Sequence, residues 1–84
     1  LPQLTEERRR EYIKMAKHTG EEGRVAVRNI RRHAKDAIEK LVKDGDVGED
    51  DGTRAEKELE SLTKKYVDAI DEALKHKEAE LLEV

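Results

Sequence analysis

The chain has 84 residues, of which 46% are charged and 35% hydrophobic, and its net charge is -3. A chain this short forms at most one small domain with a modest core, and the lack of cysteine excludes disulfides and thiolate-metal sites. No apolar run approaches the roughly 20 residues that a membrane span needs, and no signal peptide is recognisable. The charges are mixed in sign and the apolar residues recur at helical spacing, which predicts an all-α fold instead of disorder.

The first predicted helix covers residues 5–44. Thr5 is suited to cap its first backbone N–H groups, and Glu6 and Glu7 suit the positive end of the helix dipole. A spacing of three and four residues then keeps one apolar seam toward a partner helix. The seam consists of Ile13, Ala16, Gly20, Gly23, Val27, Ile30, Ala34, Ala37 and Leu41, widened in places by Val25, Ile38 and Val42.

Gly20 and Gly23 interrupt this seam, and each lowers helix propensity by about 1 kcal/mol relative to alanine. One interpretation is a kink or weak point in the helix. The other is the close approach of a second backbone, which only a residue without a side chain permits. The sequence leaves both interpretations open.

A turn is predicted over residues 45–52, where Gly45 suits the left-handed conformation that ends many helices. The second predicted helix covers residues 53–82. The acids at 49–51 could begin it earlier, but Gly52 and Thr53 favour a start one turn later. Its apolar stripe consists of Ala55, Leu59, Leu62, Tyr66, Ile70, Ala73 or Leu74, and Leu81, flanked by Val67 and Ala69.

The length of the first helix, about 55 Å at 1.5 Å per residue, predicts a rod. Two rods cover only one side of each other's apolar stripes, so a third helix is expected, either from further sequence or from a second copy. The predicted fold is therefore an elongated antiparallel helical hairpin that is part of a three-helix bundle. Alone, such a piece is expected to self-associate through its exposed apolar seam. The start at Leu1 and Pro2, without Met, also suggests part of a longer protein.

Charge is distributed unevenly: residues 1–44 hold 12 Lys/Arg and 8 Asp/Glu, whereas residues 45–84 hold 6 and 13. From Arg10 to Lys35, positions spaced by four and three residues are basic in seven of eight cases. We call the central part of this row, with one adjoining arginine, the basic ridge. It consists of Lys17, Arg24, Arg28, Arg31, Arg32 and Lys35.

No acid lies between Gly23 and Lys35, so the cations there repel one another, and an external polyanion would relieve that repulsion. Arginine also binds phosphate through two parallel N–H groups. The alternatives are a solvated face, or ion pairs with acids of the second helix. Tyr12 and Tyr66 are the only aromatic residues, which favours recognition of an RNA backbone over stacking on bases.

Three stretches resemble the ribosome recycling factor family: LTEERRR at 4–10, VAVRNIRR at 25–32 and KHKEAELL at 75–82. Their order and spacing also match, and the resemblance covers essentially the whole chain. The middle stretch is the most specific. The resemblance implies an L-shaped protein, in which one arm is a three-helix bundle and the other a β/α domain inserted after the first helix. This chain resembles the last two helices; the first helix and the inserted domain are absent.

The resemblance further implies that the factor binds the large ribosomal subunit after termination and splits the ribosome together with elongation factor G, in the cytoplasm. The bundle arm of the family contacts rRNA through arginines, which carry over to Arg24, Arg28 and Arg31, with Arg32 in support. Lys17 and Lys35 extend the same ridge. Without the inserted domain, the chain is expected to bind but not to recycle.

Other candidate sites are weak. Glu72, His76 and Glu80 lie at successive i, i+4 positions, but only one is a histidine and a solvated face is the stronger interpretation. His18 and His33 have no partner spacing, and Ser61 has no surrounding motif. We therefore expect no enzyme, no cofactor and no metal. The main competing hypothesis is a helical-hairpin interaction or dimerisation module that does not bind RNA.

Overall fold

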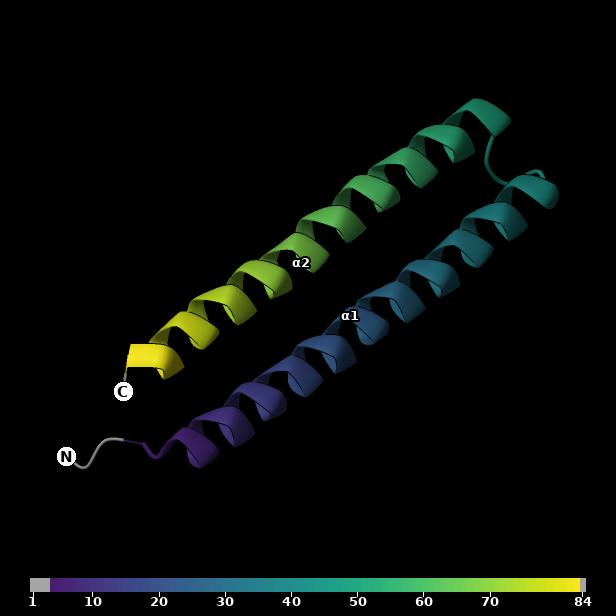
Figure 1. Cartoon of the computed structure of the whole chain (residues 1–84). Helices are drawn as coiled ribbons and strands as arrows, with labels where there is room; N and C mark the ends of the chain where they lie inside the picture. Colours follow the sequence, from purple (N-terminus) through teal and green to yellow (C-terminus); the bar gives the residue numbers. More distant parts are fainter. Residues whose placement is uncertain (1–3, 84) are drawn as a thin grey trace.

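The structure, a computed structural model, describes residues 4–83, which form two long helices, α1 (Glu6–Lys43) and α2 (Glu49–Glu83). The helices run antiparallel, so that the start of α1 and the end of α2 lie at the same end of the molecule (Figure 1). The hairpin measures 63 × 15 × 14 Å. The predicted all-α fold and rod shape are confirmed, the third helix stays a prediction, and Leu1 and Pro2 lie outside the described residues.

The start of α1 has the predicted cap. The Thr5 hydroxyl Oγ1 accepts a hydrogen bond from the backbone N–H of Arg8 at 3.1 Å. Glu6 and Glu7 occupy the first turn, where carboxylates face the positive end of the helix dipole. The sequence therefore specifies this helix start locally, through residues that are close together in the chain.

The end of α1 is closed by a Schellman motif. Gly45 has a positive φ of 79°, and its N–H donates to the Val42 carbonyl at 3.0 Å. The N–H of Asp46 donates to the Leu41 carbonyl at 2.9 Å. These two bonds satisfy carbonyls that would otherwise lack a partner at the helix end. The prediction for Gly45 is confirmed.

The second helix begins earlier than predicted, at Glu49 and not at residue 53. Gly52 lies in its first turn, is buried, and donates its N–H to the Gly48 carbonyl at 2.9 Å. A Cβ added at Gly52 would overlap the side chain of Val42. The glycine thus allows the two helices to approach closely at the turn, which the sequence pattern had misread as a delay of the helix. The other boundaries are within one residue of prediction.

The predicted apolar seams are partly wrong. In the second half of α1, the predicted Ile38 and Val42 are partly buried toward α2, as is Arg31, which was not predicted there, whereas the predicted Ile30 is 68% exposed. In α2 the predicted Tyr66 is 55% exposed. Ala37, Leu41 and Leu62 are exposed as well. The apolar stripe of each helix is wider than the surface that one neighbouring helix covers, so part of each stripe stays exposed.

Gly20 and Gly23 serve close approach. An added Cβ would lie 3.3 Å from Leu74 Cδ2 at Gly20 and 3.3 Å from Ile70 Cδ1 at Gly23. Both glycines therefore make room for side chains of α2, and α1 continues as a helix through both. The predicted approach of a second backbone is therefore wrong, because the atoms nearest to both glycines belong to side chains.

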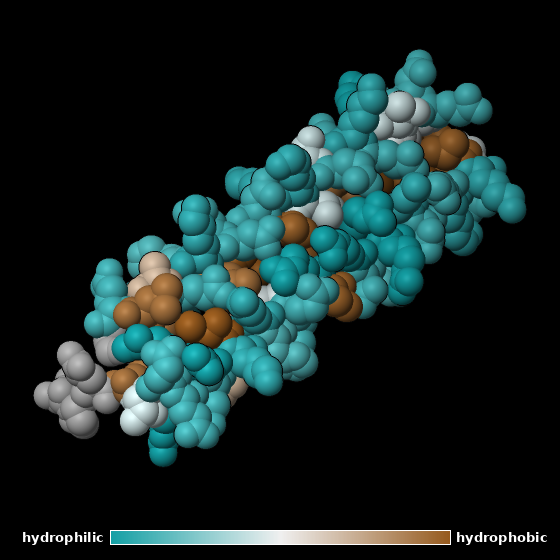
Figure 2. Space-filling view, in the orientation of Figure 1, coloured by the Kyte–Doolittle hydropathy of each residue, from teal (hydrophilic) through white to brown (hydrophobic). Residues whose placement is uncertain are grey.

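Among residues 4–83 no hydrophobic side chain is fully buried. Apolar side chains form a band along the molecule between hydrophilic surfaces (Figure 2). Two depressions lie between the helices, and we call them together the apolar groove. Its lining is mostly apolar and consists of Ala16, Thr19, Gly20, Gly23, Ile70, Ala73, Leu74 and Lys77 in one depression and Val27, Ile30, Arg31, Leu59, Leu62, Thr63 and Tyr66 in the other.

Candidate nucleic-acid interface

Most of the basic ridge lies to one side of the line along which α1 contacts α2, whereas its member Arg31 also lines the apolar groove. Taken at 100° per residue from Val27, Arg24 and Arg28 fall at about +60° and +100° around α1, whereas Ile30 falls at about -60°. The ridge follows from helical spacing alone, because residues three, four and seven apart stay on one side of a helix. Its electrostatics, however, depend on what α2 presents to it.

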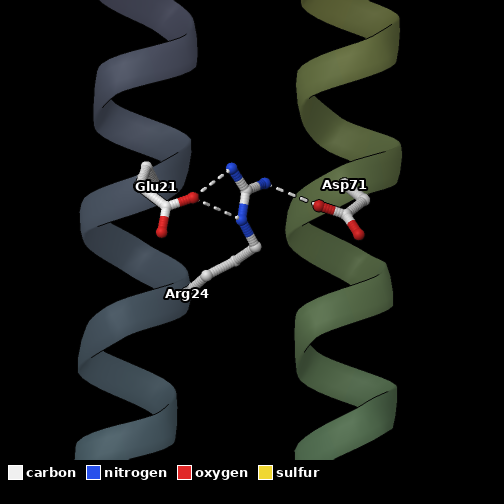
Figure 3. Close-up of polar contacts among 3 residues, drawn as sticks. All are labelled: Glu21, Arg24 and Asp71. Atoms are coloured by element: carbon white, nitrogen blue, oxygen red, sulfur yellow. Dashed lines mark hydrogen bonds and ion pairs between the residues drawn. The ribbon is translucent and has the colours of Figure 1, made fainter.

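Arg24 lies between two carboxylates (Figure 3). Its Nε and Nη2 donate to Glu21 Oε2 at 3.1 and 2.8 Å, and its Nη1 donates across to Asp71 Oδ1 on α2 at 2.6 Å. The side chain is only 18% exposed. The hydrogen bonds that Arg24 donates to Glu21 and then to Asp71 raise the pKa of Arg24. This guanidinium is already engaged on both sides.

Two further cations of the ridge reach acids of α2. Arg31 Nη1 donates to Glu60 Oε1 at 2.8 Å, and Lys17 Nζ lies 3.6 Å from Glu78 Oε1. Together with Arg24, these cations stand seven residues apart along α1. Partly exposed ion pairs contribute little to stability, but regularly spaced pairs between helices favour one alignment over others. The pairs therefore help to set the antiparallel register.

The remaining cations are available. Within the described residues, Arg28 and Arg32 are exposed and make no ion pair or hydrogen bond through their side chains. Lys35 is half-buried and likewise has no such partner in residues 4–83; it lines a shallow depression with Glu56 and Glu60. The ridge thus divides into three paired cations and three unpaired ones within the part of the chain that the structure describes.

This arrangement can bind phosphate. An exposed, unpaired guanidinium offers two parallel N–H groups to an anion, and a row of them follows a charged backbone. Tyr66 lines the apolar groove in the same depression as Arg31, and Tyr12 falls on the groove side of α1 at about -60°. Tyr66 does not share this depression with Arg28 or Arg32, the exposed arginines of the ridge, which fits contacts to phosphates better than stacking on bases.

The sequence analysis named ion pairs with acids of the second helix as an alternative, which is confirmed for Lys17, Arg24 and Arg31, but it did not identify the acids. Glu60, Asp71 and Glu78 are spaced by 11 and 7 residues, so they share one side of that helix. Their order runs opposite to that of the ridge, as an antiparallel pairing requires. This spacing was visible in the sequence, and combining it with the ridge would have identified the pairs.

The candidate metal ligands do not come together: among residues 4–83, no group of three or more His, Asp or Glu side chains is placed to hold a metal ion. His76 Nδ1 instead lies 3.1 Å from Glu80 Oε1. Neither helix, over the described range, has the length and hydropathy of a membrane span.

Comparison with known proteins agrees with the sequence motifs. Residues 1–82 match the family model of ribosome recycling factor. The chain is 76% identical over 84 residues to the ribosome-recycling factor of Acidothermus cellulolyticus, and 71% and 69% identical to those of Nocardioides sp. and Streptomyces coelicolor. Each match covers 100% of this chain and 45% of the relative. The chain therefore spans about half the length of the relatives it matches.

Proposed function

The chain belongs to the ribosome recycling factor family, and on this premise we propose that it is an rRNA-binding arm. The complete factor then splits post-termination ribosomes together with elongation factor G. The partner of this arm is the rRNA of the large subunit, and the place of action is the cytoplasm. The contact is made by the basic ridge, with Arg24, Arg28 and Arg31 as its main residues. Arg32, Lys35 and Lys17 add positive charge around them.

One observation carries the proposal: exposed arginines without a partner in residues 4–83 stand on a side of α1 that holds no acid between Gly23 and Lys35. Arg28 and Arg32 have no ion pair to give up when they meet a phosphate. Their charges also attract a polyanion before contact, over a distance of about 8 Å, which is the Debye length at physiological salt. A rod with such a side suits the backbone of a folded RNA.

The role of this chain is binding and not catalysis. We propose that GTP hydrolysis belongs to the elongation factor and that no residue of this chain acts as a catalyst. Because the chain spans 45% of its relatives, splitting of ribosomes is proposed for a full-length factor. The 84 residues alone are expected to occupy the ribosome without splitting it.

The proposal is tested by cosedimentation with large ribosomal subunits over a salt series. The chain should bind, and log K should fall by roughly one unit per unit of log salt for each phosphate contact. The variant Arg28→Ala/Arg31→Ala should lose at least tenfold in affinity, at about 1–2 kcal/mol per contact. The control Lys65→Ala/Lys75→Ala removes the same charge from exposed positions of α2 that make no ion pair in residues 4–83.

Two outcomes would contradict the proposal. One is a folded chain, verified by circular dichroism, that does not sediment with subunits at any salt concentration. The other is an equal loss in the ridge variant and in the control variant, because the ridge would then act only through net charge.

A second candidate function is favoured by the open apolar groove. Exposed Ile30 and Tyr66 beside the groove are typical of a surface that receives another helix. We propose this helix-docking role as compatible with RNA binding, because Arg28 and Arg32, the exposed arginines of the ridge, do not line the groove. A docking module alone would show helicity that depends on concentration and does not respond to removal of ridge arginines.

A further inference from the structure

Ion pairs between the helices occupy N–H groups of ridge arginines that would otherwise be free to bind RNA. Arg24 uses Nε, Nη1 and Nη2 to bind Glu21 and Asp71. Arg31 uses Nη1 to bind Glu60. A carboxylate and a phosphate compete for such N–H groups, since both offer anionic oxygens that accept hydrogen bonds from a guanidinium. RNA therefore meets a ridge in which some cations are already occupied.

The occupied arginines can exchange partners without unfolding. Asp71 and Glu60 are 54% and 60% exposed, so each carboxylate reaches water once its arginine turns away. Glu21, which also binds Arg24, is exposed too. Partly exposed ion pairs of this kind are weak, which makes them replaceable by a stronger anion. A buried pair would instead leave an uncompensated charge behind.

We propose that Asp71 and Glu60 are internal competitors of RNA phosphates for Arg24 and Arg31, and that they set the affinity of the basic ridge. This inference rests on the proposed rRNA-binding function. Arg28 and Arg32, which have no partner in residues 4–83, make the first contacts. Arg24 and Arg31 then exchange a carboxylate of α2 for a phosphate. The acids of α2 therefore regulate binding as affinity-determining residues that do not themselves contact RNA.

The experiment measures the Kd of the 84-residue chain for large ribosomal subunits at one low salt concentration. Asp71→Asn and Glu60→Gln keep the size of each side chain and remove its charge. Each is expected to tighten binding by roughly two- to fivefold, the range of a partly exposed ion pair. The control Glu58→Gln/Glu72→Gln removes two charges from exposed acids of α2 that hold no cation in residues 4–83.

A double-mutant cycle separates competition from a general change in charge. If Asp71 acts through Arg24, the gain from Asp71→Asn must disappear when Arg24→Gln is also present. The same holds for Glu60→Gln in an Arg31→Gln background. A gain that persists without the arginine, or a control variant that gains as much per charge removed, would overturn the inference.

The result also distinguishes the two proposals. If the unaltered chain does not bind subunits, the rRNA-binding function itself fails. If the chain binds but Asp71→Asn and Glu60→Gln match the unaltered protein, the competition alone fails and the rRNA-binding function stands. Circular dichroism on each variant verifies that the helices are retained, and testing two separate pairs guards against a local structural effect at one of them.

Discussion

The two long sides of the hairpin differ in what they leave unsatisfied. On the apolar groove, side chains such as Ile30 and Tyr66 face solvent, and no hydrophobic side chain of residues 4–83 is fully buried. On the basic ridge, α2 supplies acids to Arg24, Arg31 and Lys17. Within the described residues, the apolar groove is not covered by other apolar side chains, whereas half of the cations of the basic ridge are already paired with acids.

The difference shows that apolar and charged surfaces differ in how much they need to be covered by a neighbouring helix. Apolar surface stabilises a fold only when it is removed from water, and one neighbouring helix removes too little of it. A charged side chain needs no such cover, because water solvates it at little cost. Stability therefore requires that the apolar groove be covered, whereas the basic ridge can stay exposed and is available for recognition.

The largest effect is expected from moving α2, because both sides depend on its position. Gly52→Ala places a methyl group against the Val42 side chain, and we expect a loss of about 1–3 kcal/mol in unfolding free energy. Thermal unfolding followed by circular dichroism measures it. The control is Gly48→Ala, whose added Cβ meets nothing within 4 Å. Equal losses at both positions would show that the close approach at Gly52 is unimportant.

The groove itself is tested by making it polar. Ile30→Gln/Tyr66→Gln should weaken self-association of the chain at least tenfold, about 1.4 kcal/mol, because two exposed apolar side chains leave the contact. Sedimentation equilibrium and concentration-dependent helicity measure the change. The control Val25→Gln/Leu82→Gln alters two exposed apolar side chains that do not line the groove. A chain that stays monomeric at all concentrations would contradict this expectation.

A smaller effect of opposite sign is expected where the groove leaves room. At Gly23 an added Cβ meets only Ile70, whose Cδ1 lies 3.3 Å away and has to shift by a few tenths of an ångström, and the position lines the groove. Gly23→Ala should therefore stabilise the chain by up to about 1 kcal/mol through helix propensity. At Gly45 the same substitution should destabilise, because φ is 79°. If Gly23→Ala lowers the melting temperature, the groove is packed as tightly as the contact at Gly52.

The smallest effect separates paired from unpaired arginines on the ridge. Arg24→Ala removes a link between the helices and should lower the melting temperature by roughly a few degrees at most. Arg28→Ala should leave it unchanged, because Arg28 has no partner in residues 4–83. In ribosome binding, Arg28→Ala should cost as much as Arg24→Ala or more. Equal melting temperatures for the two variants would mean that the Asp71 pair does not help to hold the hairpin together.

Local features of this chain were readable from its residues alone. Thr5 accepts a hydrogen bond from the N–H of Arg8, three residues away, and Gly45 donates to the Val42 carbonyl, also three residues away. Residue type and near neighbours are therefore sufficient to predict both helix ends. The ridge was also predictable, since helical spacing determines which side of α1 its cations occupy. The family motifs, 25–32 above all, are likewise properties of the residues themselves, and comparison with known proteins confirmed the family.

Other features arise only when the two helices meet. Asp71 lies 47 residues from Arg24 and Glu60 lies 29 from Arg31, so their pairing depends on the register of the hairpin. Gly52 is required because of Val42, a neighbour on the other helix, and not because of its own propensity. A periodic pattern gives the direction of each side chain around one helix. Which part of an apolar stripe is covered, and which cations are already held, is decided by the position of the partner helix.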